Sequence, residues 1–254
     1  MSAPLLVVEA LSKSFGGVHA LRDVSFAVAV GETVAIIGPN GAGKTTCFNT
    51  IHGELAPDHG DVRLDGRTLL GRPPHAIAHR RVGRTFQVAA TFASMTVRES
   101  VALALIARER GDRATAAPML QTRSAAIDAL LVRLRIDDLA DAHCAALAYG
   151  DAKRLELAMA LALEPRLLLM DEPTAGMTPR SRRDLMELAT GLAERDNVAV
   201  LFTEHDMDIV FGFADRVLVL DRGTLIAEGS PADIKADSRV RDVYLGLGEP
   251  DAHR

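Results

Sequence analysis

Short apolar stretches dominate the beginning of the chain and indicate β-strands. Residues 33–37 form the clearest stretch, because they are rich in β-branched side chains and a glycine-rich turn follows them directly. A helix is expected after that turn, over residues 45–52. Further strands are predicted at residues 5–9, 25–30, 61–64 and 82–85, with a short helix near residues 75–80. This order of elements predicts an α/β fold with a mixed sheet.

The pattern changes between residues 96 and 162. Apolar residues recur there at helical spacing, as at Val97, Val101 and Leu105, and strand-like runs disappear. After this segment the strand pattern returns. Strands are predicted at residues 167–170, 198–203, 216–220 and 224–227, and helices at residues 180–195 and 206–214. The sequence therefore predicts an α/β core, residues 1–95 and 163–254, interrupted by a helical lobe, residues 96–162.

Composition supports a folded domain and argues against some partners. With 254 residues, of which 48% are hydrophobic, the chain can bury a sizeable core. It has 29 basic and 34 acidic side chains, so no overall positive field attracts a nucleic-acid backbone, and no nucleic-acid partner is expected. Cys47 and Cys144 have no partnering Cys or His at metal-ligand spacing, and we expect buried thiols in a reducing compartment.

The chain shows no signal for secretion or membrane insertion. Residues 1–9 lack a basic segment followed by a long apolar one, and no later stretch approaches the roughly 18 uncharged residues that a membrane span needs. A cytoplasmic, soluble chain is therefore expected. Any role at a membrane must come through a partner.

The glycine-rich turn after residue 37 fits the P-loop pattern G-x-x-x-x-G-K-[ST] at every fixed position. A strand precedes it and a helix follows, so successive backbone N–H groups and the helix N-terminus can face phosphate oxygens. Lys44 would neutralise the β- and γ-phosphates of ATP, and Thr45 would ligate Mg²⁺. The alternative is an ordinary strand-to-helix turn. The predicted phosphate-binding residues are Gly38, Pro39, Asn40, Gly41, Ala42, Gly43, Lys44, Thr45 and Thr46.

A second motif lies at the end of the predicted strand 167–170. This apolar run ends in Asp171 and Glu172. Beside a P-loop, Asp171 can hold Mg²⁺ and Glu172 can polarise the attacking water as a general base. Two exposed carboxylates that cap a strand are the simpler interpretation of this pair alone. Its combination with the P-loop favours ATP hydrolysis.

The motifs and their order resemble those of ATP-binding-cassette (ABC) ATPases over nearly the whole chain. Phe15 occupies the place of the aromatic residue that stacks on adenine in that family, Gln87 that of the Q-loop glutamine, and His205 that of the switch histidine. The resemblance implies that Gln87 contacts metal and water and faces the membrane subunit, while His205 holds the γ-phosphate. It also implies a RecA-like P-loop NTPase core with an antiparallel β subdomain.

The signature loop of the resembled family has an unusual form in this sequence. The family generally carries L-S-G-G-Q before a helix, and here residues 152–162 predict that helix. In the family this loop contacts the ATP bound by the opposite subunit, so two cassettes close head to tail. Ala148 lacks the usual serine hydroxyl, and Thr178 replaces an inter-subunit aspartate. Both departures suggest pairing with a non-identical cassette. The corresponding residues are Leu147, Ala148, Tyr149, Gly150 and Asp151.

Several stretches resemble the ATP-binding subunits of branched-chain amino-acid importers, including residues 83–87, 148–150, 204–207 and 243–246. The resemblance implies a second cassette, two membrane permeases and, indirectly, a periplasmic binding protein, with this chain on the inner face of the cell membrane. Residues 175–178 would also suit related importers of urea, amides or aromatic acids.

Three other functions agree less well with the sequence. An ABC ATPase that acts on ribosomes or DNA typically has two cassettes or a long coiled-coil insertion, and this sequence has neither. A P-loop GTPase or kinase lacks support, because no N-K-x-D motif is present. A silent regulatory module is disfavoured by the intact Lys44, Asp171, Glu172 and His205.

Overall fold

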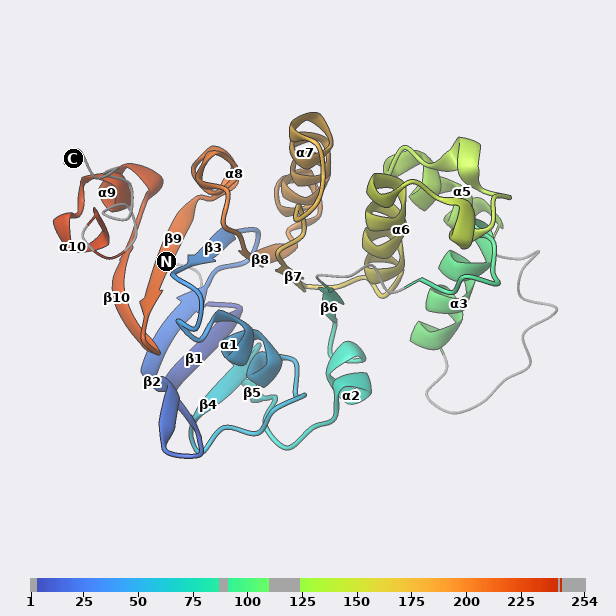
Figure 1. Cartoon of the computed structure of the whole chain (residues 1–254). Helices are drawn as coiled ribbons and strands as arrows, with labels where there is room; N and C mark the ends of the chain where they lie inside the picture. The colour runs from blue at the N-terminus through green and yellow to red at the C-terminus, as the bar shows by residue number, and fades with distance from the viewer. Residues whose placement is uncertain (1–3, 87–90, 110–123, 242, 244–254) are drawn as a thin grey trace, which may run out of the picture.

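The computed structural model describes residues 4–86, 91–109, 124–241 and 243, and its strands form two sheets (Figure 1). The smaller sheet is antiparallel with the order β2-β1-β4-β5, and the larger sheet has the order β10-β9-β3-β8-β7-β6. This arrangement confirms the predicted α/β fold with a mixed sheet and an antiparallel subdomain. The strands are β1 (Leu6–Phe15), β2 (Val18–Val28), β3 (Thr33–Ile37), β4 (His59–Leu64), β5 (Arg67–Thr68), β6 (Val82–Thr85), β7 (Leu167–Asp171), β8 (Ala199–Thr203), β9 (Arg216–Asp221) and β10 (Thr224–Gly229).

The larger sheet brings the ends of its strands to one edge. Strands β9, β3, β8, β7 and β6 pair in parallel, and β10 pairs antiparallel with β9. Every residue of β3, β7 and β8 is buried, as expected for parallel strands that are covered on both faces. The segments that follow β3, β8, β7 and β6 therefore start side by side at the carboxyl edge of this sheet.

Successive side chains of the central strand β3 belong alternately to two hydrophobic clusters. Val34 and Ile36 of β3 belong to the cluster that contains Phe48 of α1 and the smaller sheet. Ala35 and Ile37 belong to the opposite cluster, together with α7 and α8. The helices of the α/β core are α1 (Lys44–Ile51), α2 (Pro74–Ala78), α7 (Pro179–Asp196), α8 (Met207–Phe213), α9 (Pro231–Ala236) and α10 (Ser238–Val240).

A group of helices lies at one side of the core, beyond β6 (Figure 1). The chain enters it after β6 and returns directly into β7, so the group is inserted between two adjacent strands of the sheet. The proposed limits of this lobe, residues 96 and 162, stay a prediction. Its described elements are α3 (Val97–Glu109), α5 (Ser124–Arg133), η1 (Asp137–Leu139), η2 (Cys144–Ala146) and α6 (Tyr149–Ala162).

The first hairpin and the start of α6 differ from the sequence predictions. Strand β1 continues to Phe15 and β2 begins at Val18, so both strands are longer than predicted. Register shifts in this pair, the first between Val8 and Leu11, break the regular alternation on which the prediction relied. Helix α6 begins at Tyr149 rather than at residue 152, because its first turn contains polar and small residues without an apolar repeat.

Candidate functional site

The P-loop turn wraps closely around the start of α1. Gly43 is the N-cap of α1 in a left-handed conformation, with φ 103°. A Cβ atom at this position would lie 2.4 Å from the carbonyl oxygen of Ala20, so only glycine fits without displacement of the main chain. No side chain caps α1, and its first N–H groups lack intrahelical partners. The turn therefore presents backbone donors and a positive helix end, as an anion site requires.

Lys44 folds back over this turn. Its Nζ donates hydrogen bonds to the carbonyl oxygens of Gly38 at 2.7 Å and Pro39 at 3.2 Å. Burial lowers the pKa of the Lys44 ammonium from its ordinary value of 10.5, and the charges of Glu172 and Asp171 partly oppose this shift. The ammonium thus already lies at the P-loop, where a phosphate oxygen can replace the carbonyl oxygens as its partner.

The hydroxyl of Thr203 joins the two acidic residues at the end of β7. Thr203 pairs with Asp171 in the register of β7 and β8. Its Oγ1 donates to Asp171 Oδ1 at 2.7 Å and accepts from the N–H of Glu172 at 3.0 Å. Glu172 has a φ of 45°, a left-handed conformation that is costly for a non-glycine residue. The end of β7 is therefore fixed to β8 through the Thr203 hydroxyl.

His205 and Glu172 are in direct contact. The distance from His205 Nε2 to Glu172 Oε1 is 2.8 Å. The preceding residue, Glu204, is buried and accepts hydrogen bonds from the N–H and the hydroxyl of Thr174, at 2.9 and 2.6 Å. The loop after β8 is therefore hydrogen-bonded to the loop after β7. These bonds keep His205 and Glu172 of the predicted site together.

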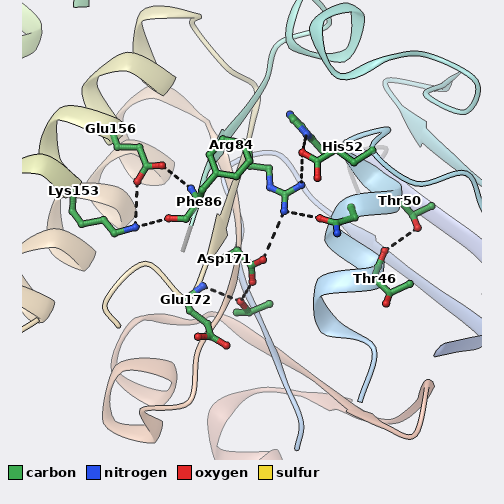
Figure 2. A network of polar contacts seen from close by, with 12 residues as sticks. Thr46, Thr50, His52, Arg84, Phe86, Lys153, Glu156, Asp171 and Glu172 are labelled. Carbon is green, nitrogen blue, oxygen red and sulfur yellow. Dashed lines mark hydrogen bonds and ion pairs between the residues drawn. The ribbon is translucent and has the colours of Figure 1, made fainter. Parts of the chain in front are cut away.

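Arg84 is a residue of this site that the sequence analysis missed. Its side chain is only 5% exposed, and its Nη2 lies 2.7 Å from Asn49 Oδ1 and 3.7 Å from Asp171 Oδ2 (Figure 2). Its Nη1 lies 3.3 Å from Glu54 Oε1. The guanidinium links β6, β7 and the end of α1. An arginine within a short strand that is expected to be buried was the available signal, because a buried charge requires partners.

Two further parts of the predicted site, Phe15 and the signature loop, lie at the periphery. Phe15 ends β1 with 48% of its surface exposed, and Lys13 Nζ lies 5.6 Å from its ring centroid. Ala148 is the N-cap of α6, and Tyr149, 43% exposed, starts the helix. Gln87 lies outside the described residues. Of the three, Phe15 and the signature loop therefore have a described position, and both present open surface.

The signature loop contacts the segment that follows the acidic pair. A Cβ atom added at Gly150 would lie 3.7 Å from Met177 Cε, and one added at Gly176 would lie 3.6 Å from Tyr149 Cε1. Both distances correspond to ordinary van der Waals contact. The start of α6 therefore lies beside the loop that leaves β7.

Comparison with known proteins decides the family. The family model described as ABC transporter matches residues 21–175, which is more than half of the chain. This chain belongs to the ABC transporter family. Residues 224–249 of the cassette also match the family model described as branched-chain amino acid ATP-binding cassette transporter.

Two curated relatives match the cassette over nearly their full length. LivG of Salmonella typhimurium, a high-affinity branched-chain amino acid transport ATP-binding protein, is 39% identical over 97% of this chain and 99% of its own. BraF of Pseudomonas aeruginosa, which has the same description, is 38% identical with the same coverage. The cassette is therefore an ATPase subunit of the ABC transporter type.

Solved structures agree with this assignment. The ADP conformation of an ATP-binding cassette of an ABC transporter has a TM-score of 0.85 and 30% identity, and the match covers 98% of this chain and 100% of that one. A dimeric post-hydrolysis cassette bound to ADP and Pi has a TM-score of 0.76 and 25% identity, over 89% and 98% of the two chains. Among the described residues of this cassette, no helix is long and apolar enough to cross a membrane.

Proposed function

We propose that the cassette drives the import of branched-chain amino acids by Mg-ATP hydrolysis, together with a second cassette and membrane permeases. The observation that carries the catalytic part is the 2.8 Å contact between His205 and Glu172 at the sheet edge that also bears Lys44. The near full-length similarity to LivG and BraF supports the choice of solute. Related importers of urea, amides or aromatic acids are the alternative outcome.

The P-loop would bind the triphosphate. Backbone N–H groups of residues 40–46 would surround phosphate oxygens, and the Lys44 ammonium would neutralise the β- and γ-phosphates. The Thr45 hydroxyl and the Asp171 carboxylate are oxygen donors, which suit Mg²⁺ bound together with phosphates. When bound, Mg²⁺ supplies charge neutralisation at the γ-phosphate. Phe15, with its open ring, would stack on adenine.

Glu172 would act on the attacking water. A carboxylate can accept the water proton as a general base. The charge of Glu172 opposes the lowering of the Lys44 pKa, so this carboxylate lies near the P-loop. His205 would contact the γ-phosphate and keep the carboxylate oriented through the contact that the structure shows. Gln87 would complete this set by contact with metal and water.

The second cassette would complete each ATP site with its own signature loop. In this chain that loop comprises Leu147, Ala148, Tyr149, Gly150 and Asp151, at the exposed N-terminus of α6. Ala148 provides no hydroxyl, so the contact with γ-phosphate would rely on backbone N–H groups of the first helical turn. ATP would then bridge two subunits, and hydrolysis would remove the bridge.

An apolar hollow supports docking of a permease. It has a volume of about 330 Å³ and lies between the end of β6 and the helical lobe. Phe86, Phe92 and Leu103 line it, and each is more than a third exposed. Exposed large apolar side chains that gather around a hollow favour contact with another protein. The cassette would sit at the inner face of the membrane through this contact, with a periplasmic binding protein engaged only through the permeases.

Purification of the tagged chain from native membranes tests this proposal. We expect a second cassette and permeases to co-purify, and the reconstituted complex to hydrolyse ATP faster when leucine, isoleucine or valine is presented with the binding protein. Stimulation by urea, an amide or an aromatic acid instead would replace the solute. Recovery of ribosomes or DNA without permeases would overturn the transport function.

A further inference from the structure

Two buried side chains of α6 hold the main chain of Phe86, just beyond the end of β6 (Figure 2). Glu156 Oε1 accepts a hydrogen bond from the N–H of Phe86 at 2.7 Å. Lys153 Nζ donates to the carbonyl oxygen of Phe86, and it lies 3.3 Å from Glu156 Oε2. The N–H and the carbonyl oxygen of Phe86 are thus both bound by an ion pair of α6, the helix that begins at the signature loop.

The burial of two charged side chains at this position costs desolvation free energy, which apolar packing would avoid. The Lys153 and Glu156 side chains are 2% and 5% exposed, so each charge has been removed from water. Apolar side chains of similar size would usually fill such a site at equal or lower free energy. Beyond Thr85 the pairing of β6 with β7 stops. The ion pair therefore continues the attachment of this segment, but attaches it to α6 instead of to the sheet.

The two sides of the contact lead to different parts of the ATPase. Arg84, two residues before Phe86, contacts Asp171 and Asn49, so this part of β6 is fixed to the nucleotide site. On the other side, Lys153 Nζ lies 6.0 Å from the ring centroid of Tyr149, the first residue of α6 and part of the signature loop. A continuous set of contacts thus joins Asp171 to the loop that serves the opposite subunit.

We propose that Lys153 and Glu156 are positioning residues that hold the signature loop at a fixed distance from the end of β6. They contact neither the nucleotide nor the water. Their effect is on the placement of residues 147–151 against the ATP of the partner cassette, and a displacement of about 1 Å there can slow catalysis by about 100-fold. This inference rests on the proposed function, because it requires a second cassette.

The decisive variant replaces both side chains, Lys153→Met with Glu156→Leu. This pair removes the buried charges together, so it should cost less stability than either single change, which would leave one buried charge without its partner. Lys153→Arg is the matched control, because it keeps a cation and a donor at the same position. Glu156→Gln is a second test, since it removes the ion pair but keeps an acceptor for the Phe86 N–H, and the Lys153 ammonium keeps the Phe86 carbonyl oxygen as an acceptor.

We expect the double variant to bind Mg-ATP as the isolated chain within about twofold of wild type, because its own P-loop is untouched. In the purified complex with its partner cassette and permeases, kcat for ATP should fall by about 10- to 100-fold, with KM nearly unchanged. Lys153→Arg should recover most of kcat, and Glu156→Gln should lie between. The thermal midpoint of the double variant checks that it is folded.

The inference is overturned if the folded double variant retains the wild-type kcat, or if KM and kcat change in parallel with loss of Mg-ATP binding. Should the double variant fail to fold, Glu156→Gln decides by the same two readouts. A failure of the proposed function looks different, because the wild-type complex itself would then contain no second cassette or show no turnover.

Discussion

At the scale of single residues, the hydroxyl of Thr203 organises the catalytic edge. It binds the carboxylate of Asp171 and the backbone of Glu172 at the same time. Asp171 is proposed to bind Mg²⁺ and Glu172 to activate the water, so their relative position matters to both proposed roles. The sequence could not show this role, because Thr203 is 31 residues away from Glu172 and belongs to an ordinary apolar strand.

Replacement of the base separates binding from hydrolysis. Glu172→Gln removes the proton acceptor but keeps the size of the side chain and an oxygen within reach of His205. We expect Mg-ATP affinity within a few-fold of wild type and a loss of turnover of about 100-fold or more. Isothermal calorimetry and phosphate release measure the two quantities. Substantial remaining hydrolysis would remove Glu172 from the role of base.

His52 makes stability depend on pH. Burial lowers its pKa from the ordinary value of 6.5, and the nearby Arg84 charge acts in the same direction, while Glu54 opposes both. The unfolded chain therefore binds this proton more readily than the folded chain. The stability that neutral His52 contributes is complete above about pH 6.5, the pKa of the unfolded chain. It is lost as the pH falls through the lower pKa that His52 has in the folded chain.

The measurement compares wild type with His52→Gln by urea unfolding at several pH values. Between pH 7.5 and pH 5.5, wild type should lose more unfolding free energy than the variant. An equal loss in both proteins, or a larger loss in the variant, would contradict the assigned direction of the pKa shift.

At the scale of elements, the parallel strands of the larger sheet were the most predictable part. The limits of β3 and β6 agree with the sequence predictions, because a short apolar run bounded by turn residues leaves little choice of register. The bulged hairpin β1–β2, the two-residue β5 and the short helices α9 and α10 carry no such periodic signal. The hairpin and β5 depend on pairing between strands, whereas α9 and α10 begin at local caps formed by Ser230 and Asp237.

The candidate site divides in the same way. Residues 38–46 and the pair Asp171–Glu172 could be found because their chemistry is encoded in contiguous motifs. Lys153 and Glu156 could not, because each is defined by a partner from another element, and Arg84 gave only the signal of a charge within a strand that is expected to be buried. Within a single sequence, an isolated charged residue on a helix is ordinarily a solvent-exposed one.

The turn between β3 and α1 should be intolerant of a Cβ atom at Gly43. Gly43→Ala would force a residue with a φ of 103° against a carbonyl oxygen 2.4 Å away. We expect a loss of about 3 kcal/mol or more in the free energy of unfolding. The matched control is Gly212→Ala in α8, where nothing lies within 4 Å of the added atom. It should change stability by less than about 1 kcal/mol. Equal effects in urea unfolding would refute this explanation.

At the scale of the whole molecule, the helical lobe is attached to the α/β core next to the strands that carry the candidate site. It is inserted between β6 and β7, and β7 carries Asp171. The start of α6 also lies beside the loop after β7. Movement of the lobe relative to the core would therefore alter the signature loop and the catalytic edge together, which is the coupling that a transport motor needs.

The form of the signature loop and of residue 178 predicts that the chain pairs with a different cassette. Thr178 supplies no carboxylate. It is the N-cap of α7, and its hydroxyl oxygen accepts a hydrogen bond from the N–H of Ser181. We expect Glu172→Gln to stay monomeric with Mg-ATP in sedimentation velocity, and to dimerise when the co-purified second cassette is added. A stable, ATP-dependent homodimer of the pure chain would contradict this prediction.

Titration of the folded chain with Mg-ATP tests the central claim most directly, since every other step assumes that the turn after β3 binds a nucleotide. Calorimetry should show saturable binding for wild type and an affinity at least about tenfold lower for Lys44→Ala, because a charge-assisted contact with the phosphates is lost. Thermal unfolding should confirm that both proteins are folded. No heat of binding for wild type, or equal affinity for the variant, would contradict the account.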